Sequence, residues 1–222
     1  MKYWIPNCVT LLNLVFGMLS IFATLGGDYY AAAWCIVLAM VADGMDGRVA
    51  RYFKVSSEMG KELDSLCDLA SFGVAPGVLA YAFLLKDAGA LGAFAAAFFA
   101  ACGAFRLARF NVNASVVKGY FMGLPIPAGG CLVATFIMMD VRPESWIFSL
   151  MMLAFGYLMV SKVHYPDFKG KGEKLRVLPA VAAAALGAFL LFYSMQAVFF
   201  VPFICYAVFG VLNTALAFAA GK

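Results

Sequence analysis

Hydrophobic residues recur along the chain in long runs, and short polar segments separate these runs. A helix that crosses a lipid bilayer needs about 20 mostly apolar residues. Candidate spans that approach or meet this length are found at 8–26, 29–47, 62–85, 88–108, 123–140, 146–161, 176–194 and 196–219. The pattern therefore predicts an all-α polytopic membrane protein with about eight transmembrane helices.

The overall composition supports this prediction. Hydrophobic residues make up 65% of the 222-residue chain and charged residues only 13%. A soluble domain is closer to about 45–50% apolar and about 25% charged residues. Proline and glycine are dispersed, with no linker-like or low-complexity run. We therefore expect one integral-membrane unit without a separate soluble domain.

The positions of the basic residues predict an orientation. When the N-terminus is placed in the cytoplasm, Lys86 and Arg142 are the only two of the 16 lysines and arginines in the predicted outer turns. An excess of basic residues on the cytoplasmic side is the usual bias of membrane proteins. We predict that both termini are cytoplasmic, and that the segment between the second and third spans faces the cytoplasm.

Four aspartates border this cytoplasmic segment: Asp43, Asp46, Asp64 and Asp68. A carboxylate at the centre of a bilayer costs on the order of 3 kcal/mol by insertion scales. Spacings of three and four residues place each pair on one helical face. Two antiparallel helices joined by a short loop can bring the pairs together, so something must compensate four neighbouring negative charges.

Divalent cations would supply that compensation. Four carboxylates without histidine or thiolate form a hard, oxygen-only ligand set, which suits Mg²⁺, Mn²⁺ or Ca²⁺ rather than zinc. Two divalent ions would balance the four charges. Small residues clear space along the second span, and Arg51 could reach a phosphate. The pattern indicates a diphosphate site; the alternative is that the aspartates only pair with Arg48, Arg51 and Lys61 to join helices.

The aspartate segment resembles the CDP-alcohol phosphotransferase family, whose signature is D-x2-D-G-x2-A-R-x8-G-x3-D-x3-D. Every fixed position of the signature is filled here, by Asp43, Asp46, Gly47, Ala50, Arg51, Gly60, Asp64 and Asp68. The segments "IPNCVTLLNLVFG" (5–17), "ELDSLCDLASFGVAP" (62–76), "FRLARFN" (105–111) and "GLPIPAGG" (123–130) resemble one branch, the phosphatidylserine synthases. This resemblance implies transfer of the phosphatidyl group from CDP-diacylglycerol to L-serine, with release of CMP.

The resemblance also implies an architecture and a set of site residues. It implies a six-helix core at about 1–162, within a single catalytic domain over 1–222 that ends in two additional helices at about 176–219, and usually a homodimer. Two Mg²⁺ or Mn²⁺ ions would be bound by the four aspartates, and Asp68 would also accept the proton of the acceptor hydroxyl. The expected contacts to the CDP-lipid are Asn7, Thr10, Asp46, Gly47, Arg51, Ser57 and Gly60.

The acceptor site is predicted from the chemistry of serine. Free serine is a zwitterion, so its carboxylate needs a cation. The segment "FRLARFNVNASVVKGYF" after the fourth span supplies Arg106, Arg109, Asn111, Asn113 and Lys118 on the same predicted face as the aspartates. Arg106 and Asn111 are our first candidates for serine contacts, followed by Lys118. The alternative is that these residues set topology and contact lipid headgroups.

Three other functions stay open at this point. The same chemistry could serve a phosphorylated acceptor, as in phosphatidylglycerophosphate or phosphatidylinositol-phosphate synthesis. It could also use an ether lipid, as in archaetidylserine synthesis. Finally, acids within a membrane also mark the ion pathways of transporters. However, transporters place such sites near the midplane, whereas these aspartates lie near the predicted inner face.

Overall fold

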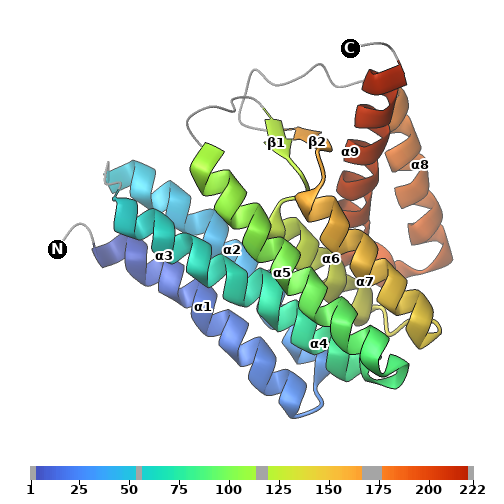
Figure 1. The fold of residues 1–222 in the computed structure, drawn as a ribbon, viewed down its shortest axis with the longest axis horizontal. Helices are drawn as coiled ribbons and strands as arrows, with labels where there is room; N and C mark the ends of the chain where they lie inside the picture. The colour runs from blue at the N-terminus through green and yellow to red at the C-terminus, as the bar shows by residue number, and fades with distance from the viewer. Residues whose placement is uncertain (1–3, 54–56, 114–119, 167–176, 220–222) are drawn as a thin grey trace.

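The computed structural model describes residues 4–53, 57–113, 120–166 and 177–219. Within these ranges the chain is almost entirely helical (Figure 1). The α-helices are α1 (Trp4–Leu25), α2 (Tyr29–Phe53), α3 (Glu58–Asp68), α4 (Ala75–Phe83), α5 (Ala90–Asn113), α6 (Ile126–Met138), α7 (Ser145–Val160), α8 (Val177–Tyr193) and α9 (Val201–Ala219).

Helices α3 and α4 form one continuous 26-residue rod, Glu58–Phe83, joined by the π-helical turn η1 (Leu69–Val74). Two short 3₁₀ helices, η2 (Leu85–Ala88) and η3 (Met195–Phe199), precede α5 and α9. Each predicted span therefore corresponds to a helix. The boundaries differ by up to six residues: α2 extends to Phe53 instead of 47, and α9 begins at Val201 instead of 196 because a 3₁₀ turn occupies the start of the apolar run.

Among the residues that the structure describes, four helical segments are long and apolar enough to cross a membrane: Asn7–Leu25, Glu58–Phe83, Ala90–Val112 and Val201–Phe218. Three shorter apolar helices, α6, α7 and most of α8, accompany them. Helix α2 has 25 residues and carries Asp43 and Asp46 in its second half. The chain is thus a helical membrane protein, and the full count of eight spans stays a prediction.

The all-α class is confirmed, and one small feature was not foreseen. Strands β1 (Tyr120–Met122) and β2 (His164–Pro166) form a small antiparallel sheet, in which Phe121 lies opposite Tyr165. The pattern of apolar runs could not reveal it because three-residue strands carry no periodic signal. The sheet lies beside α9, where the His164 backbone N–H donates to Thr214 Oγ1 at 2.9 Å.

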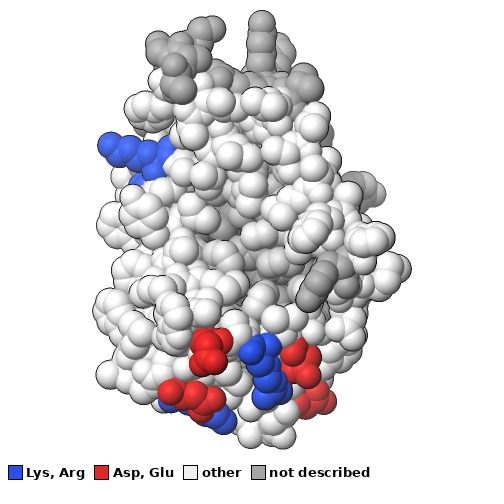
Figure 2. Space-filling view, turned by 90° about the vertical axis from the view of Figure 1, so that its right-hand side faces the viewer, with Lys and Arg blue, Asp and Glu red and all other residues white. Residues whose placement is uncertain are grey.

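The core lies between α4, α5, α6 and α7. Phe72, Phe99, Phe148 and Leu132 are completely buried there. Helices α1 and α2 pack along one side of this core, while α8 and α9 stand together on the other side (Figure 1). Figure 2 shows the surface on the α7–α9 side as a broad uncharged band, with most of its charged side chains gathered at one end. Such a band suits contact with lipid.

Candidate active site

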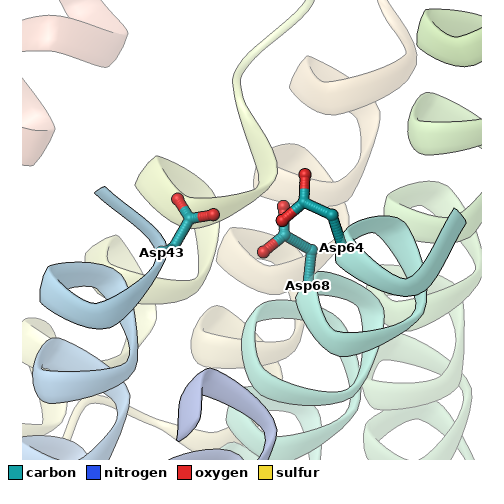
Figure 3. A group of neighbouring side chains, drawn as sticks. All are labelled: Asp43, Asp64 and Asp68. Atoms are coloured by element: carbon teal, nitrogen blue, oxygen red, sulfur yellow. The ribbon is translucent and has the colours of Figure 1, made fainter. Parts of the chain in front are cut away.

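The second half of α2 and the second half of α3 bring three carboxylates together. Asp43 extends from α2 toward Asp64 and Asp68 of α3 (Figure 3). One oxygen of each side chain lies within 4.8 Å of the others. Asp64 and Asp68 share a face because they are four residues apart on one helix. Two pairs that are distant in the sequence therefore meet at one point, as the spacing indicated.

The fourth aspartate, Asp46, lies beside this group and is buried. Its side chain lies near that of Asp64 and interacts with it electrostatically. Thr10 of α1 donates from Oγ1 to Asp46 Oδ2 at 2.8 Å. Thr10 and Asp46 were both expected at the nucleotide, and the structure places their side chains next to each other.

A residue that the sequence analysis missed, Asn13, holds Asp68. The Asn13 amide donates from Nδ2 to Asp68 Oδ1 at 3.0 Å, and its backbone oxygen accepts from Ser71 Oγ at 2.9 Å. Asn13 is completely buried. A signal was present in the sequence, because Asn7, Thr10 and Asn13 follow one another at three-residue steps along one face of an apolar helix.

Two oxygens of this network are buried without a hydrogen-bond partner among the described residues: Asp64 Oδ1 and Asn13 Oδ1. A buried polar atom is costly unless it is paired. Unpaired hard oxygens beside converging carboxylates are the donors that Mg²⁺ and similar ions prefer. The residues present therefore fit a divalent cation.

In the competing interpretation, basic residues pair with the aspartates only to join helices. One of the three basic residues that it needs, Lys61, is paired elsewhere. Lys61 forms an ion pair with Glu58 at 2.8 Å on the exposed surface of α3. Arg51 lies in the last turns of α2, where the surroundings of its side chain fall outside the described part of the chain. The same holds for its neighbour Gly47.

The beginnings of α1 and α3 meet next to the aspartates. Ser57 caps α3, where its Oγ accepts from the Gly60 N–H at 3.0 Å. A Cβ added to Gly60 would lie 3.1 Å from Ser57 Oγ and 3.5 Å from Asn7 Oδ1. Three expected nucleotide contacts are therefore neighbours in space. Beside Gly44 of α2, a Cβ would meet nothing within 4 Å, which leaves room for a ligand.

Helix α5 brings the acceptor candidates to the same place. Arg106 is buried, interacts electrostatically with Asp68 and Asp43, and has its guanidinium 5.3 Å from the Phe110 ring centre. Asn111 donates from Nδ2 to Ser65 Oγ of α3 at 3.0 Å. Both candidates thus face the aspartate helix. Lys118 lies outside the described residues.

Arg109 has a different environment from Arg106, although it is only three residues away. Its guanidinium donates to the backbone oxygens of Val160 at 2.7 Å, Met122 at 2.8 Å and Ser161 at 3.2 Å. These contacts tie α5 to the end of α7 and to β1. Arg109 therefore supports the structure around the site, whereas Arg106 faces the site itself.

Helix α9 also reaches the site, which the sequence analysis did not foresee. Tyr206 interacts electrostatically with Arg106, and its ring lies 5.1 Å from the ring of Tyr165 in β2. Gly210, one turn further along α9, allows this approach because a Cβ there would collide with the Tyr165 ring. A tyrosine within an apolar run carries no signal that marks it as a site residue.

Comparison with known proteins agrees with this geometry. The sequence model of the CDP-alcohol phosphatidyltransferase family matches residues 3–165, which contain all four aspartates. This chain belongs to the CDP-alcohol phosphatidyltransferase family. The family resemblance expected from the signature is thereby confirmed, and helices α8 and α9 lie beyond the matched segment.

Several curated relatives of this family member carry specific names. A CDP-diacylglycerol–serine O-phosphatidyltransferase of Helicobacter pylori is 39% identical over 175 residues, covering 75% of this chain and 73% of the relative. The enzyme of the same name from Bacillus subtilis is 38% identical, covering 75% and 92%. An archaetidylserine synthase of Methanothermobacter thermautotrophicus is 35% identical, covering 76% and 72%.

Proposed function

We propose that this protein is a CDP-diacylglycerol–serine O-phosphatidyltransferase: it transfers the phosphatidyl group of CDP-diacylglycerol to the hydroxyl of L-serine and releases CMP. The observation that carries the proposal is the convergence of Asp43, Asp64 and Asp68 from the two halves of a complete family signature. The choice of serine follows the names of the relatives in Helicobacter pylori and Bacillus subtilis.

We propose that Asp43, Asp46, Asp64 and Asp68 bind two Mg²⁺ or Mn²⁺ ions. The support is the oxygen-only donor set and the unpaired buried oxygen of Asp64. When bound, such ions would neutralise the carboxylates and the diphosphate and make phosphorus more electrophilic. Thr10 then orients Asp46 through its hydrogen bond.

Asp68 is proposed as the base. The serine hydroxyl oxygen forms a bond to the phosphorus that carries diacylglycerol, the bond from that phosphorus to CMP breaks, and the hydroxyl proton passes to Asp68. Because Asn13 donates to Oδ1, the second carboxylate oxygen is the one left to accept this proton. The buried guanidinium of Arg106 interacts electrostatically with this carboxylate. No covalent phosphatidyl-enzyme is needed.

The CDP part is proposed to lie between the start of α1 and the facing ends of α2 and α3. Its contacts would come from Asn7, Thr10, Asp46, Gly47, Arg51, Ser57 and Gly60. The open space beside Gly44 and the meeting of Asn7 with Gly60 support this placement. Serine would enter from α5, where Arg106 pairs with its carboxylate and Asn111, with Lys118, completes the pocket.

The architecture of the protein follows the same proposal. Residues 1–222 form a single catalytic domain with a six-helix core at about 1–162 and two additional helices, and the active protein is a homodimer. The active site and both termini face the cytoplasm, because nearly all basic residues fall on that side of the predicted spans.

An acceptor panel tests the activity. Purified protein with CDP-diacylglycerol and Mg²⁺ or Mn²⁺ should release CMP with serine, and not with inositol, inositol phosphate or glycerol 3-phosphate. A chelator should abolish the release, and excess metal should restore it. Release with a phosphorylated acceptor alone would retain the family and refute serine as the acceptor.

A second candidate differs only in the lipid. The relative in Methanothermobacter thermautotrophicus is named an archaetidylserine synthase. The same panel should therefore be repeated with CDP-archaeol. Faster turnover of the ether lipid at equal serine concentration would favour this second function.

A further inference from the structure

Asn13 of α1 has one half of its side-chain amide bonded and the other half buried without a partner. Its Nδ2 donates to Asp68 Oδ1 at 3.0 Å. Its Oδ1 has no hydrogen-bond partner among the described residues, and the residue is completely buried. A buried carbonyl oxygen is costly unless a donor reaches it. A ligand that brings a donor to this point, directly beside the proposed base, would remove that cost.

Serine brings three polar groups into the site, and the proposed contacts of Arg106 and Asp68 account for two of them. Arg106 pairs with the carboxylate, and Asp68 accepts the proton of the hydroxyl. The ammonium group of serine is a strong donor that still needs an acceptor. The four aspartates are already engaged with metal ions in the proposed function, so a neutral oxygen is the kind of partner that remains.

The positions of Asn13 and Asp68 match the spacing of these groups in serine. The hydroxyl and the ammonium group are carried by adjacent carbons, so their partners in the protein must be neighbours. Asn13 and Asp68 are in direct contact, and Arg106 of α5 interacts with Asp68 as well. Asp68 and Arg106 are themselves buried. An opening that lets serine reach these two residues therefore also brings it to Asn13.

We propose that Asn13 Oδ1 accepts a hydrogen bond from the ammonium group of serine, and that this contact selects an amino acid among possible acceptors. The inference rests on the proposed function, since it concerns recognition of the same acceptor. An amide oxygen accepts a hydrogen bond without taking the proton, while Nδ2 keeps Asp68 oriented. One side chain thus links recognition of the acceptor to the position of the base.

Asn111 of α5 is a second amide near the aspartates. Its Nδ2 donates to Ser65 Oγ at 3.0 Å, and Ser65 lies on α3 three residues before Asp68. Asn111 is therefore about one helical turn away from the base, whereas Asn13 contacts the base itself. The structure favours Asn13 for the ammonium group, and Asn111→Ala provides the comparison.

The test compares L-serine with 3-hydroxypropionate, which has the same carboxylate and hydroxyl but lacks the ammonium group. CMP release by the purified full-length protein gives the KM for serine and the inhibition constant of 3-hydroxypropionate against serine. Asn13→Ala should raise the serine KM by roughly 10–100-fold, the effect of losing a hydrogen bond to a charged group. The inhibition constant should change little. If Asn13 only orients Asp68, kcat should fall and the serine KM should not rise.

Asn13→Leu is the second variant, for the case that Asn13→Ala does not fold. It keeps the branched shape of the side chain, avoids the cavity that alanine leaves, and should raise the serine KM in the same selective way. The matched control is Ser20→Ala. Ser20 Oγ is also buried without a partner among the described residues, but it lies about 10.5 Å further along α1. Its loss should leave the serine KM unchanged.

Three results would refute the contact: equal changes in the serine KM and the inhibition constant, a selective rise in KM for Asn111→Ala instead of Asn13→Ala, or a higher metal requirement with an unchanged serine KM. Absence of CMP release with serine from the wild-type protein would refute the proposed function itself. Normal release by the wild type together with unselective Asn13 variants would refute only the contact to the ammonium group.

Discussion

The surroundings of Asp64 and Asp68 differ, although the two side chains are one helical turn apart. Asp68 accepts from Asn13 and interacts with the buried Arg106. Asp64 has a buried oxygen without a partner among the described residues. An oriented carboxylate with a defined free oxygen suits proton transfer, whereas an unpaired oxygen suits a cation. Their contacts thus support separate roles for two residues that the sequence alone presents as equivalent.

Asp68→Asn should reduce CMP release by about 10²–10⁴-fold, the usual contribution of a general base, while CDP-diacylglycerol remains bound. The amide keeps the shape of the side chain and can still contact Asn13, so folding should be preserved. Asp87→Asn, in the exposed turn before α5, is the matched control and should be fully active. A rate for Asp68→Asn close to the wild type would exclude Asp68 as the base.

Alanine substitutions of Arg106 and Arg109 in α5 should have different effects on serine kinetics and on thermal stability. Arg106→Ala should raise the serine KM by roughly 10–100-fold, the effect of losing a charged hydrogen bond, with a much smaller change in the lipid KM. Arg109→Ala should instead lower the melting temperature, because it leaves the Val160 and Met122 oxygens unpaired. Equal changes in both KM values for Arg106→Ala would refute its assignment to serine.

Single residues were predictable where a motif or a charge marked them. The four aspartates stood out because carboxylates are rare within apolar runs. Asn13 and Tyr206 were not predicted. Asn13 is a single amide inside an apolar helix, and Tyr206 is one of many aromatic residues, so neither residue type marked a site. The sequence analysis preferred Arg106 to Arg109 as a serine contact, but the bonds of Arg109 to Val160 and Met122 could not be predicted, since they depend on which segments lie beside it.

Contacts between helices fix the positions of these side chains. Helix α1 approaches η1 so closely that a Cβ at Gly17 would lie 2.9 Å from the Ser71 Cα and would collide with its hydroxyl oxygen. The neighbouring Ser71–Asn13 hydrogen bond joins the same two elements. The orientation of Asn13 toward Asp68 therefore depends on a close helix–helix contact that only glycine permits.

Gly17→Ala should destabilise the protein by about 1–3 kcal/mol, as overpacking of a tight contact usually does, and should reduce activity through Asn13. Gly44→Ala is the matched control because a Cβ there meets nothing within 4 Å. Its melting temperature should stay the same or rise. Thermal unfolding in detergent would measure both, and an unchanged midpoint for Gly17→Ala would contradict the close contact.

The helices themselves were largely predictable, since an apolar run of sufficient length has few alternatives in a bilayer. Their junctions were not. The sheet of β1 and β2 depends on contacts between distant segments, such as Tyr165 against α9, and no periodic signal marked the π-helical turn after Asp68. A single sequence shows which residues are apolar, and it does not show which helices become neighbours.

On the face drawn in Figure 2 the molecule has an uncharged band, with most of the charged side chains gathered at one end. This distribution and the positions of the lysines predict its orientation. A cysteine introduced by Lys86→Cys should react with a membrane-impermeant maleimide added to intact cells. One introduced by Lys61→Cys should react only after the membrane is permeabilised. The wild type, with its six native cysteines, gives the background; the reverse pattern would place the active site outside the cell.

The π-helical turn also has a consequence for comparing relatives. Leu69–Val74 bonds at i→i+5, so it accommodates one residue more than an α-helix of the same length. A relative with an uninterrupted α-helix here, and with the same residues facing inward on both sides, must be one residue shorter between its counterparts of Asp68 and Pro76. A single-residue gap in the alignment at this place would therefore indicate that the relative lacks the π-helical turn.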